Sequence, residues 1–418
     1  MKKVAIETLG CKLNQAESEE LAVKLAKAGC SIVNTDDGVD IYILNTCTVT
    51  HIADRKTRHL LRMARRCNPG AVIIAIGCYP QRNRQELAAI DGVDMVLDND
   101  EKLELIERLA GGGYLPEMLP PDADFCGLRS RSFVRAQQGC SNFCAYCIVP
   151  SVRGREKSLP PDEVVSAVKD RQGRGYREVV LTGTEIGSYN YKGIDITGLI
   201  EAILNRTSIE RLRLSSLQPS HITPQLVELW RNERLCPHFH LSLQSGSNGV
   251  LARMKRRYRA EDYNRAVALI RSIVPDVAIT TDIIVGFPGE SNIEFEESYN
   301  FCQCMRFARI HVFPYSSRPG TEAAGMKGQV SAVVKKERSR RMLVLAEESA
   351  RSFRQGFTGE TMPVLWEQRN KGVWSGLTGN YIRVYIRSEE DLTGCITAVK
   401  LEKLWRDGVW GAIASTPR

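Results

Sequence analysis

The sequence contains no run of about 20 consecutive apolar residues, the length that a helix needs to cross a lipid bilayer. Its opening residues, Met1-Lys-Lys-Val-Ala-Ile-Glu7, also lack the apolar stretch of a secretion signal. These two absences argue against a membrane protein and a secreted protein, so we expect a cytoplasmic one. With 43% apolar residues over 418 positions, the chain is long enough for two or three domains with substantial cores.

The chain also lacks a strong excess of either charge, because 57 basic residues against 49 acidic ones give a net charge of +8. The net charge alone therefore does not indicate nucleic-acid binding. Basic residues cluster in three segments, 55–66, 253–259 and 335–341, and those of the first segment fall largely at helical spacing. Any one segment is most simply a solvated helix face, but the three together favour a polyanionic partner such as RNA.

Cysteine is the residue that the sequence has in excess. Thirteen cysteines, an odd number in a chain expected to be cytoplasmic, indicate metal or redox chemistry more than disulfides. Cys140, Cys144 and Cys147 lie together, and three thiolates can hold three irons of a [4Fe–4S] cluster and leave the fourth iron open. A structural zinc site, the alternative, needs a fourth Cys or His at short spacing, and none follows Cys147. We predict a catalytic iron–sulfur site at these three cysteines.

Residues 1–110 alternate between two kinds of segment. Short runs rich in β-branched residues predict buried parallel strands at 4–9, 41–45 and 72–76, and apolar periodicity predicts helices at 16–28, 53–65 and 101–109. This pattern is typical of a three-layer α/β domain. Each predicted strand ends at a cysteine, and the carboxyl ends of such strands meet at one edge. We therefore expect Cys11, Cys47 and Cys78 to converge as a second three-thiolate site, unless they are ordinary buried cysteines, as we assign Cys30 and Cys67.

The remaining residues predict two further domains after a Gly- and Pro-rich linker at 111–121. Strand–helix alternation from 132 to 354 gives about six βα units and ends in an amphipathic helix at 335–353. The predicted strands of this region are 133–137, 178–182, 211–214, 238–243, 277–284 and 310–314. Five short strands, at 362–367, 372–375, 381–386, 394–399 and 408–412, predict a small antiparallel β-barrel.

The run Cys140-x-x-x-Cys144-x-x-Cys147, with Tyr146 before its last cysteine, resembles the radical S-adenosylmethionine (SAM) superfamily. The resemblance implies a partial (β/α)6 barrel and an open iron that binds the amino and carboxylate groups of SAM. It also implies cleavage of SAM to a 5′-deoxyadenosyl radical that abstracts hydrogen from an unactivated C–H bond. The cofactor carries this chemistry, and the protein supplies position and exclusion of water.

With the strand-end cysteines, the whole chain resembles the methylthiotransferase family of that superfamily. The resemblance implies three domains: residues 1–115 with an auxiliary [4Fe–4S] cluster on Cys11, Cys47 and Cys78, residues 126–356 with the radical SAM barrel, and residues 357–418 with a TRAM-like barrel that binds tRNA. A purely structural role for the last barrel stays open, because its charge is nearly balanced. The implied cofactors are two [4Fe–4S] clusters and SAM, which serves as both radical source and methyl donor.

Short segments of the sequence resemble those of one branch of the family. This branch adds a methylthio group to C2 of N6-threonylcarbamoyladenosine (t6A) at position 37 of tRNA, giving ms2t6A. The matching segments are Thr8-Leu9-Gly10-Cys11-Lys12-Leu13-Asn14-Gln15, Asn45-Thr46-Cys47-Thr48-Val49-Thr50 and Ala53-Asp54-Arg55-Lys56. The isopentenyladenosine branch usually has Ser-Val-Arg after the second cysteine, and the ribosomal-protein branch has Gly-Phe. Asn14 and Gln15 either orient the cluster or cap the following helix.

The resemblance also assigns binding residues. Those expected to contact SAM are Tyr146, Gly183, Thr184, Glu185, Ser242, Gln244, Asp282, Gly286 and Tyr315. Those expected to contact tRNA are Arg55, Arg58, Arg62, Arg153, Arg155, Arg369 and Arg383. Arginine suits SAM carboxylate as well as phosphate, and we favour phosphate for Arg153 and Arg155. A flavodoxin- or ferredoxin-like electron donor is the other implied partner.

Three alternatives remain beside this assignment. One is a methylthiotransferase that acts on isopentenyladenosine in tRNA or on a ribosomal protein. Another is a non-catalytic iron–sulfur protein that binds RNA. The third is a cobalamin-dependent radical SAM methylase, but such proteins usually carry Asp-x-His-x-x-Gly, and no His of this sequence lies in that context.

Overall fold

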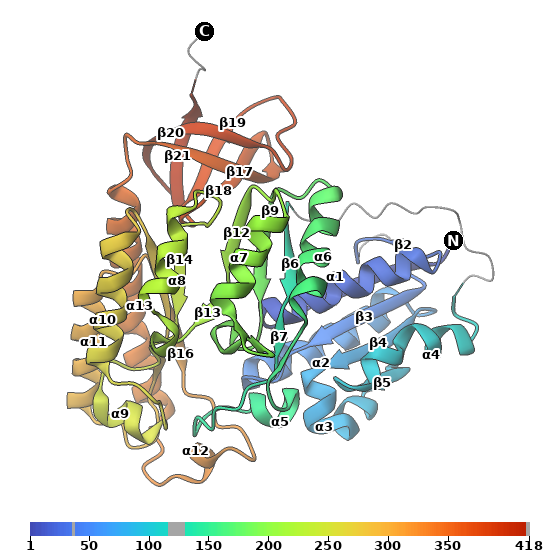
Figure 1. The fold of residues 1–418 in the computed structure, drawn as a ribbon. Coiled ribbons are helices and arrows are strands. Elements are labelled where there is room, and N and C mark those ends of the chain that lie inside the picture. The colour runs from blue at the N-terminus through green and yellow to red at the C-terminus, as the bar shows by residue number, and fades with distance from the viewer. Residues whose placement is uncertain (36–37, 116–129, 415–418) are drawn as a thin grey trace. The chain divides into compact units, whose positions relative to one another are not determined.

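The computed structural model describes residues 1–35, 38–115 and 130–414, which form two structural units (Figure 1). The first unit comprises Met1–Gly127, Gln138–Lys157 and Ser316–Thr321, and the second comprises Leu128–Gln137, Ser158–Tyr315 and Glu322–Arg418. The loop of the Cys140 motif therefore belongs to the same unit as the N-terminal residues. Most of the predicted linker and the expected domain start at residue 126 lie outside the described residues.

The first unit is built on a five-stranded parallel sheet of order β2-β1-β3-β4-β5. Alternate residues of β3 face opposite sides: Tyr42 and Leu44 pack in one apolar cluster, whereas Ile41 and Ile43 pack in another. This two-sided burial explains the continuous apolar runs and confirms the three-layer α/β architecture. The strands are β1 Lys3–Thr8, β2 Ser31–Ile32, β3 Ile41–Thr46, β4 Val72–Gly77 and β5 Met95–Leu97. The helices are α1 Lys12–Lys27, α2 His51–Cys67, α3 Cys78–Ala88, η1 Glu101–Glu104, α4 Leu105–Gly111 and α5 Val149–Arg153.

The second unit contains the predicted partial barrel, whose parallel strands form two sheets of order β12-β9-β6 and β13-β14-β15-β16. The strands are β6 Arg131–Arg135, β9 Glu178–Thr182, β12 Arg211–Leu214, β13 Ser216–Leu217, β14 His238–Leu241, β15 Ala278–Val285 and β16 Arg309–Pro314. The helices are α6 Pro161–Gly173, α7 Ile196–Arg206, α8 Pro224–Glu228, α9 Asn248–Arg253, α10 Ala260–Ile273, α11 Asn292–Met305, α12 Glu322–Gly325 and α13 Ala332–Gln355. Minor elements are β7 Gln137–Gln138, β8 Lys157–Ser158, β10 Asn190–Tyr191, β11 Ile194–Asp195, η2 Ile186–Ser188, η3 Pro219–His221 and η4 Leu229–Arg231.

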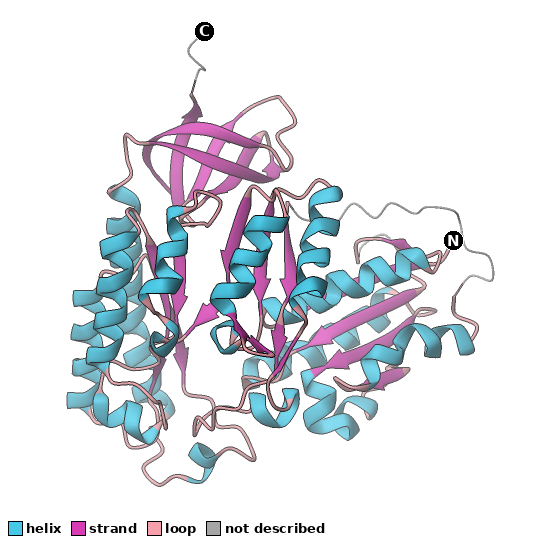
Figure 2. Cartoon of the chain, in the orientation of Figure 1, coloured by secondary structure: helices cyan, strands magenta, loops and turns pink. Residues whose placement is uncertain are grey.

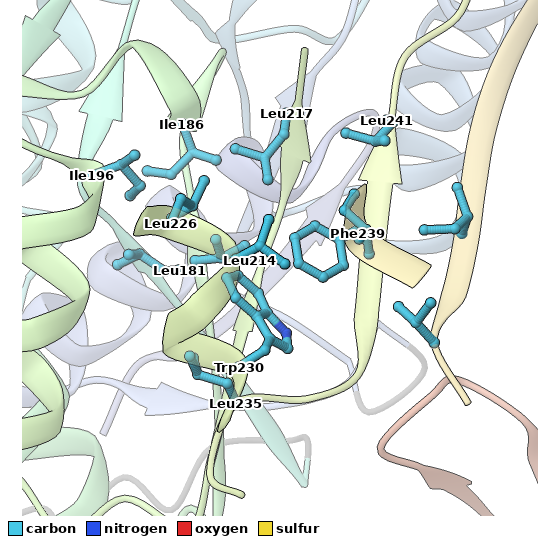
Figure 3. Close-up of a cluster of buried hydrophobic side chains, with 14 of the residues drawn as sticks. Leu181, Ile186, Ile196, Leu214, Leu217, Leu226, Trp230, Leu235, Phe239 and Leu241 are labelled. Atoms are coloured by element: carbon cyan, nitrogen blue, oxygen red, sulfur yellow. The ribbon is translucent and has the colours of Figure 1, made fainter. Parts of the chain in front are cut away.

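Alternation along the barrel strands separates a helix-facing apolar layer from a polar interior. Phe239 and Leu241 of β14 point into the apolar cluster of Figure 3, where the Phe239 ring lies 4.2 Å from that of Trp230. The Trp230 indole Nε1 donates a hydrogen bond to the Cys236 carbonyl at 2.8 Å, so its buried polar group is satisfied. The intervening residue His240 therefore faces the inside of the barrel.

The C-terminal segment forms the predicted small barrel, drawn as strands joined by loops in Figure 2. Its closed order is β17-β18-β19-β21-β20, and all pairs are antiparallel except β19 with β21. Trp366 fills the interior at 0% exposure. The strands are β17 Thr361–Asn370, β18 Val373–Thr378, β19 Arg383–Arg387, β20 Ile396–Trp405 and β21 Gly408–Ile413.

Candidate functional site

The three strand-end cysteines lie at one edge of the first unit's sheet. Cys11 follows β1, Cys47 follows β3 and Cys78 follows β4, and these three strands are neighbours in register. The pKa of the Cys47 thiol is raised to about 12, chiefly by burial and also by the nearby Cys78 and Cys11 sulfurs. The fold therefore brings together three cysteines that lie far apart in the sequence, as predicted.

Two glycines, each directly before a cysteine, permit this convergence. Gly10 has a φ of +100° and Gly77 a φ of +102°, values that L side chains rarely adopt. A Cβ at Gly10 would lie 2.6 Å from Cys47 Cβ, and one at Gly77 would lie 2.7 Å from Asn45 Oδ1. Close approach at the strand ends therefore requires glycine at both positions.

Asn14 joins the ends of two of these strands. Its Nδ2 donates to the Leu9 carbonyl at 2.8 Å and to the Thr46 carbonyl at 2.9 Å. Its Oδ1 lies 3.5 Å from Cys11 Sγ, from which it accepts a hydrogen bond. Cys11 is the N-cap of α1, and its side chain makes no capping hydrogen bond. Asn14 thus positions the cysteine edge and does not cap the helix.

The loop of the Cys140 motif packs against the same edge. Ile148 and Val152, which follow the motif, form a buried cluster with Cys78. The Asn99 side chain donates to the Val152 carbonyl at 2.6 Å and lies 3.8 Å from Cys78 Sγ. Within the motif, the Cys147 amide donates to the Cys144 carbonyl at 3.0 Å. Both groups of three cysteines therefore belong to one packed unit.

Arg153, expected to contact phosphate, is buried instead. Its side chain is 5% exposed and forms an ion pair with Glu17, and its Nε donates to Cys78 Sγ at 3.1 Å. Lys102 Nζ lies 2.8 Å from Glu17 Oε1, the oxygen that Arg153 Nη1 also contacts. The expectation that Arg153 contacts phosphate is therefore wrong, because its guanidinium already binds Glu17 and Cys78 inside the protein.

Glu17 makes the stability of the first unit depend on pH. Burial would raise the pKa of Glu17, but Arg153 and Lys102 outweigh burial and lower it from 4.5 to about 2. A depressed carboxyl pKa contributes stability above pH 4.5 that is lost as the pH falls toward 2, here about 3 kcal/mol. We expect urea unfolding of the apoprotein to show this loss in the parent and not in Glu17→Gln. Parallel pH curves for the two proteins would contradict the assignment.

A second buried ion cluster holds the loop after Cys47. Arg318 Nη2 donates to Asp54 Oδ2 at 2.6 Å and to Thr48 Oγ1 at 3.0 Å, and Arg82 Nε donates to the same hydroxyl at 2.7 Å. Thr48 in turn donates to Asp54 Oδ1 at 2.6 Å. Arg318 was not among the predicted site residues, although it lies in a loop that directly follows a barrel strand.

The residues expected to contact SAM lie mainly at the carboxyl ends of the barrel strands. Gly183, Thr184 and Glu185 follow β9, and the Glu185 amide donates to Gln137 Oε1 at 3.0 Å. Those that follow later strands are Ser242 and Gln244 after β14, Gly286 after β15 and Tyr315 after β16. Tyr146 lies in the motif loop of the first unit. Their roles as SAM contacts stay predictions.

Asp282 differs from the others because it lies within β15, facing the barrel interior. Its Oδ2 lies 3.2 Å from His240 Nε2, and the other ring nitrogen of His240 lies 2.9 Å from Thr280 Oγ1. One ligand atom each from Asp282, His240 and His311 lie within 4.8 Å of one another. His240 and His311 were not among the predicted site residues, although each lies in a strand that the sequence predicts, at 238–243 and 310–314.

The other predicted RNA contacts lie at surfaces. Arg55 and Arg62 of α2 are exposed and, with Arg58, His59, Met63 and Arg66, line a concave surface. Arg58 also pairs with Glu86 at 2.9 Å. Arg155 is exposed, Arg369 pairs with Glu389 at 2.6 Å, and Arg383 lies 3.6 Å from Asp407.

Across the described residues, no helix is both long and apolar enough to span a membrane.

The donor chemistry of both cysteine groups fits a [4Fe–4S] cluster. Each group offers three sulfur ligands, the number that fixes three irons and leaves one open. Cys78 Sγ accepts hydrogen bonds from Arg153 and Asn99, as a cluster-bound thiolate does. The residues that would hold the two clusters are therefore Cys11, Cys47 and Cys78 for one, and Cys140, Cys144 and Cys147 for the other.

Comparison with known proteins gives matches over nearly the whole chain. Residues 134–302 match the radical SAM superfamily, and residues 3–98 match an uncharacterized protein family, UPF0004. The chain is 35% identical to "Threonylcarbamoyladenosine tRNA methylthiotransferase MtaB" of Bacillus subtilis, over 96% of this chain and 94% of that protein. It is 37% identical to the MtaB of Aquifex aeolicus, over 91% of this chain and 96% of that protein. It is 32% identical to "tRNA-2-methylthio-N(6)-dimethylallyladenosine synthase" of Syntrophotalea carbinolica, over 98% and 99%.

Solved structures agree on the fold. The radical SAM methyltransferase TsrM from Kitasatospora setae, solved with cobalamin and a [4Fe–4S] cluster, matches with a TM-score of 0.55 at 13% identity. The match covers 90% of this chain and 80% of TsrM. At this identity the likeness concerns the fold alone. The family matches, together with relatives above 30% identity over nearly the whole chain, show that the chain belongs to the radical SAM methylthiotransferase family.

Proposed function

We propose that the protein adds a methylthio group to C2 of t6A at position 37 of tRNA, giving ms2t6A, with two [4Fe–4S] clusters and with SAM as radical source and methyl donor. The observation that carries the proposal is that both groups of three cysteines lie in one packed unit. Insertion of sulfur into an inert C–H bond needs two kinds of chemistry, and each group of cysteines can serve one of them.

In this proposal the chain's own residues position the clusters, SAM and the tRNA. Radical SAM enzymes use a [4Fe–4S] cluster to cleave SAM, and a second cluster with an open iron would supply a place for the incoming sulfur. The turn after β9 and the loops after β14, β15 and β16 present backbone groups at the carboxyl ends of the strands, where ligands of such barrels bind. The exposed arginines of α2 offer phosphate contacts for tRNA, and the C-terminal barrel is the other proposed tRNA contact.

The t6A substrate is supported by the residues after Cys47. Thr48 and Asp54, which belong to the segments resembling the t6A branch, are joined in one buried cluster with Arg82 and Arg318. The relatives named MtaB, at 35% and 37% identity, agree with this choice. A relative named for dimethylallyladenosine lies at 32% identity, so the isopentenyladenosine branch is the nearest rival.

Nucleoside mass spectrometry tests the substrate. The reconstituted protein is incubated anaerobically with SAM, a reductant, a sulfur source and one of three tRNAs, which carry t6A, isopentenyladenosine or unmodified adenosine at position 37. We expect a methylthio product from the t6A tRNA at least tenfold above the other two. An equal or larger yield from the isopentenyladenosine tRNA would contradict the assignment.

A further inference from the structure

Arg153 contacts the site of one cluster although it belongs to the loop of the other. It ends α5, just after the Cys140 motif, and its Nε lies 3.1 Å from Cys78 Sγ. Its Nη2 donates to Asn14 Oδ1, and Asn14 accepts the hydrogen bond of Cys11. One guanidinium thus contacts Cys78 directly and holds Asn14, whose Oδ1 lies 3.5 Å from Cys11 Sγ.

The charges around Arg153 leave an excess of one positive charge. Arg153 and Lys102 both pair with Glu17, so two cations face one carboxylate, and all three side chains are at most 10% exposed. Burial would lower the pKa of Arg153, but the Cys78 sulfur and Glu17 outweigh burial and raise it. An excess positive charge that is buried is favourable only when an anion lies beside it. The thiolates that would bind the cluster are the nearby anions.

We propose that Arg153 is a positioning residue that sets the reduction potential of the cluster held by Cys11, Cys47 and Cys78. The inference rests on the second cluster of the proposed function. Hydrogen bonds to ligand sulfurs and nearby positive charge are among the determinants of iron–sulfur potentials. Both stabilise the reduced state, because reduction adds negative charge. Removal of Arg153 therefore makes this cluster harder to reduce.

Substitution of Glu17 tests the direction in which charge shifts the reduction potential. It holds Arg153 but carries the opposite charge, so its neutralisation leaves more positive charge beside Cys78. The charge-removing changes Arg153→Met and Glu17→Gln should shift the potential in opposite directions. A purely structural role for the two residues would predict shifts in the same direction, because each change loosens the same ion pair.

Titration of one cluster alone measures the effect. In the full-length chain, Cys140, Cys144 and Cys147 are replaced by alanine, so that only the strand-end cysteines bind iron. The midpoint potential is then followed by EPR during an anaerobic redox titration. We expect Arg153→Met to shift the reduction equilibrium at least tenfold toward the oxidised form, which is about 59 mV for one electron. We expect Glu17→Gln to shift it toward the reduced form.

Arg108→Met is the matched control, because Arg108 lies on the surface of the same unit, where it pairs with Glu101 and Glu104. It should leave the potential unchanged. Shifts of the same sign for Arg153→Met and Glu17→Gln, or shifts no larger than the control's, would overturn the inference. If Arg153→Met holds no iron, Arg153→Lys is titrated instead, since it keeps the charge and loses the planar fork. Because this variant keeps the charge, Arg153→Gln, which removes the charge, is titrated beside it. A parental potential in Arg153→Gln would overturn the inference.

The parent of this series separates the two proposals. If the chain without the motif cysteines binds no four-iron cluster, the second cluster of the proposed function fails, and this inference fails with it. If that chain binds the cluster and Arg153 does not affect its potential, the proposed function stands and only the role of Arg153 is lost.

Discussion

Alanine at Cys11 is expected to abolish methylthio transfer to tRNA while leaving SAM cleavage intact. Cys11 belongs to the strand-end group, whereas the proposed function gives SAM cleavage to the cluster on Cys140, Cys144 and Cys147. Cys144→Ala is expected to abolish both reactions. The measurements are 5′-deoxyadenosine formation with dithionite, ms2t6A in the tRNA, and iron content, which should fall by half in each variant.

Cys67→Ala is the control for this experiment. Cys67 was expected to be buried, but it is an exposed cysteine at the end of α2, away from the carboxyl ends of the strands. It should keep both reactions and the full iron content. Loss of SAM cleavage in Cys11→Ala would contradict the division of labour between the two groups. Parental iron content in Cys11→Ala would contradict the second cluster itself.

The convergence of the strand-end cysteines could be predicted because it depends on local signals and one topological rule. Each strand is marked by a β-branched run, and parallel strands align their carboxyl ends. The sequence did not show which strands are neighbours. The structure shows that β1 pairs with β3 and that β3 pairs with β4. Helix α3 was missed because Pro80 and the non-helical Asn83 interrupt its pattern.

The partners of the cysteines could not be predicted in the same way. Arg153 pairs with a residue 136 positions earlier, and Arg318 pairs with one 264 positions earlier. Nothing in the local pattern distinguishes such an arginine from one on the surface, because burial of charge depends on a partner that the fold supplies. Glu17 is one of three glutamates on the helix after Cys11, and nothing in the sequence distinguished it as the one that would hold a buried cation. Tertiary contacts, and not local propensity, thus decide the surroundings of the site.

Glutamine at Glu178 is expected to destabilise the second unit by about 3–5 kcal/mol. Glu178 is 0% exposed, and Arg213 donates to it at 2.8 Å and 3.3 Å. Arg211 lies 3.7 Å and Arg131 4.0 Å from the same carboxylate. Loss of its charge would leave three arginines without their shared anion. Tyr381 stacks on Arg213 at 3.9 Å, so part of the strain should reach the C-terminal barrel.

The same arginines attach the C-terminal barrel to the SAM barrel. Arg213 donates to the Gly379 carbonyl at 2.7 Å, Arg211 to the Pro363 carbonyl at 2.7 Å, and Arg131 to Glu367 at 2.7 Å. We therefore expect Glu178→Gln to expose the junction to protease before the rest of the chain unfolds. Glu210→Gln is the matched control: its partner Arg177 is 43% exposed, and surface pairs contribute about 1 kcal/mol or less. Equal denaturation midpoints for the two variants would show that the arginines do not depend on Glu178.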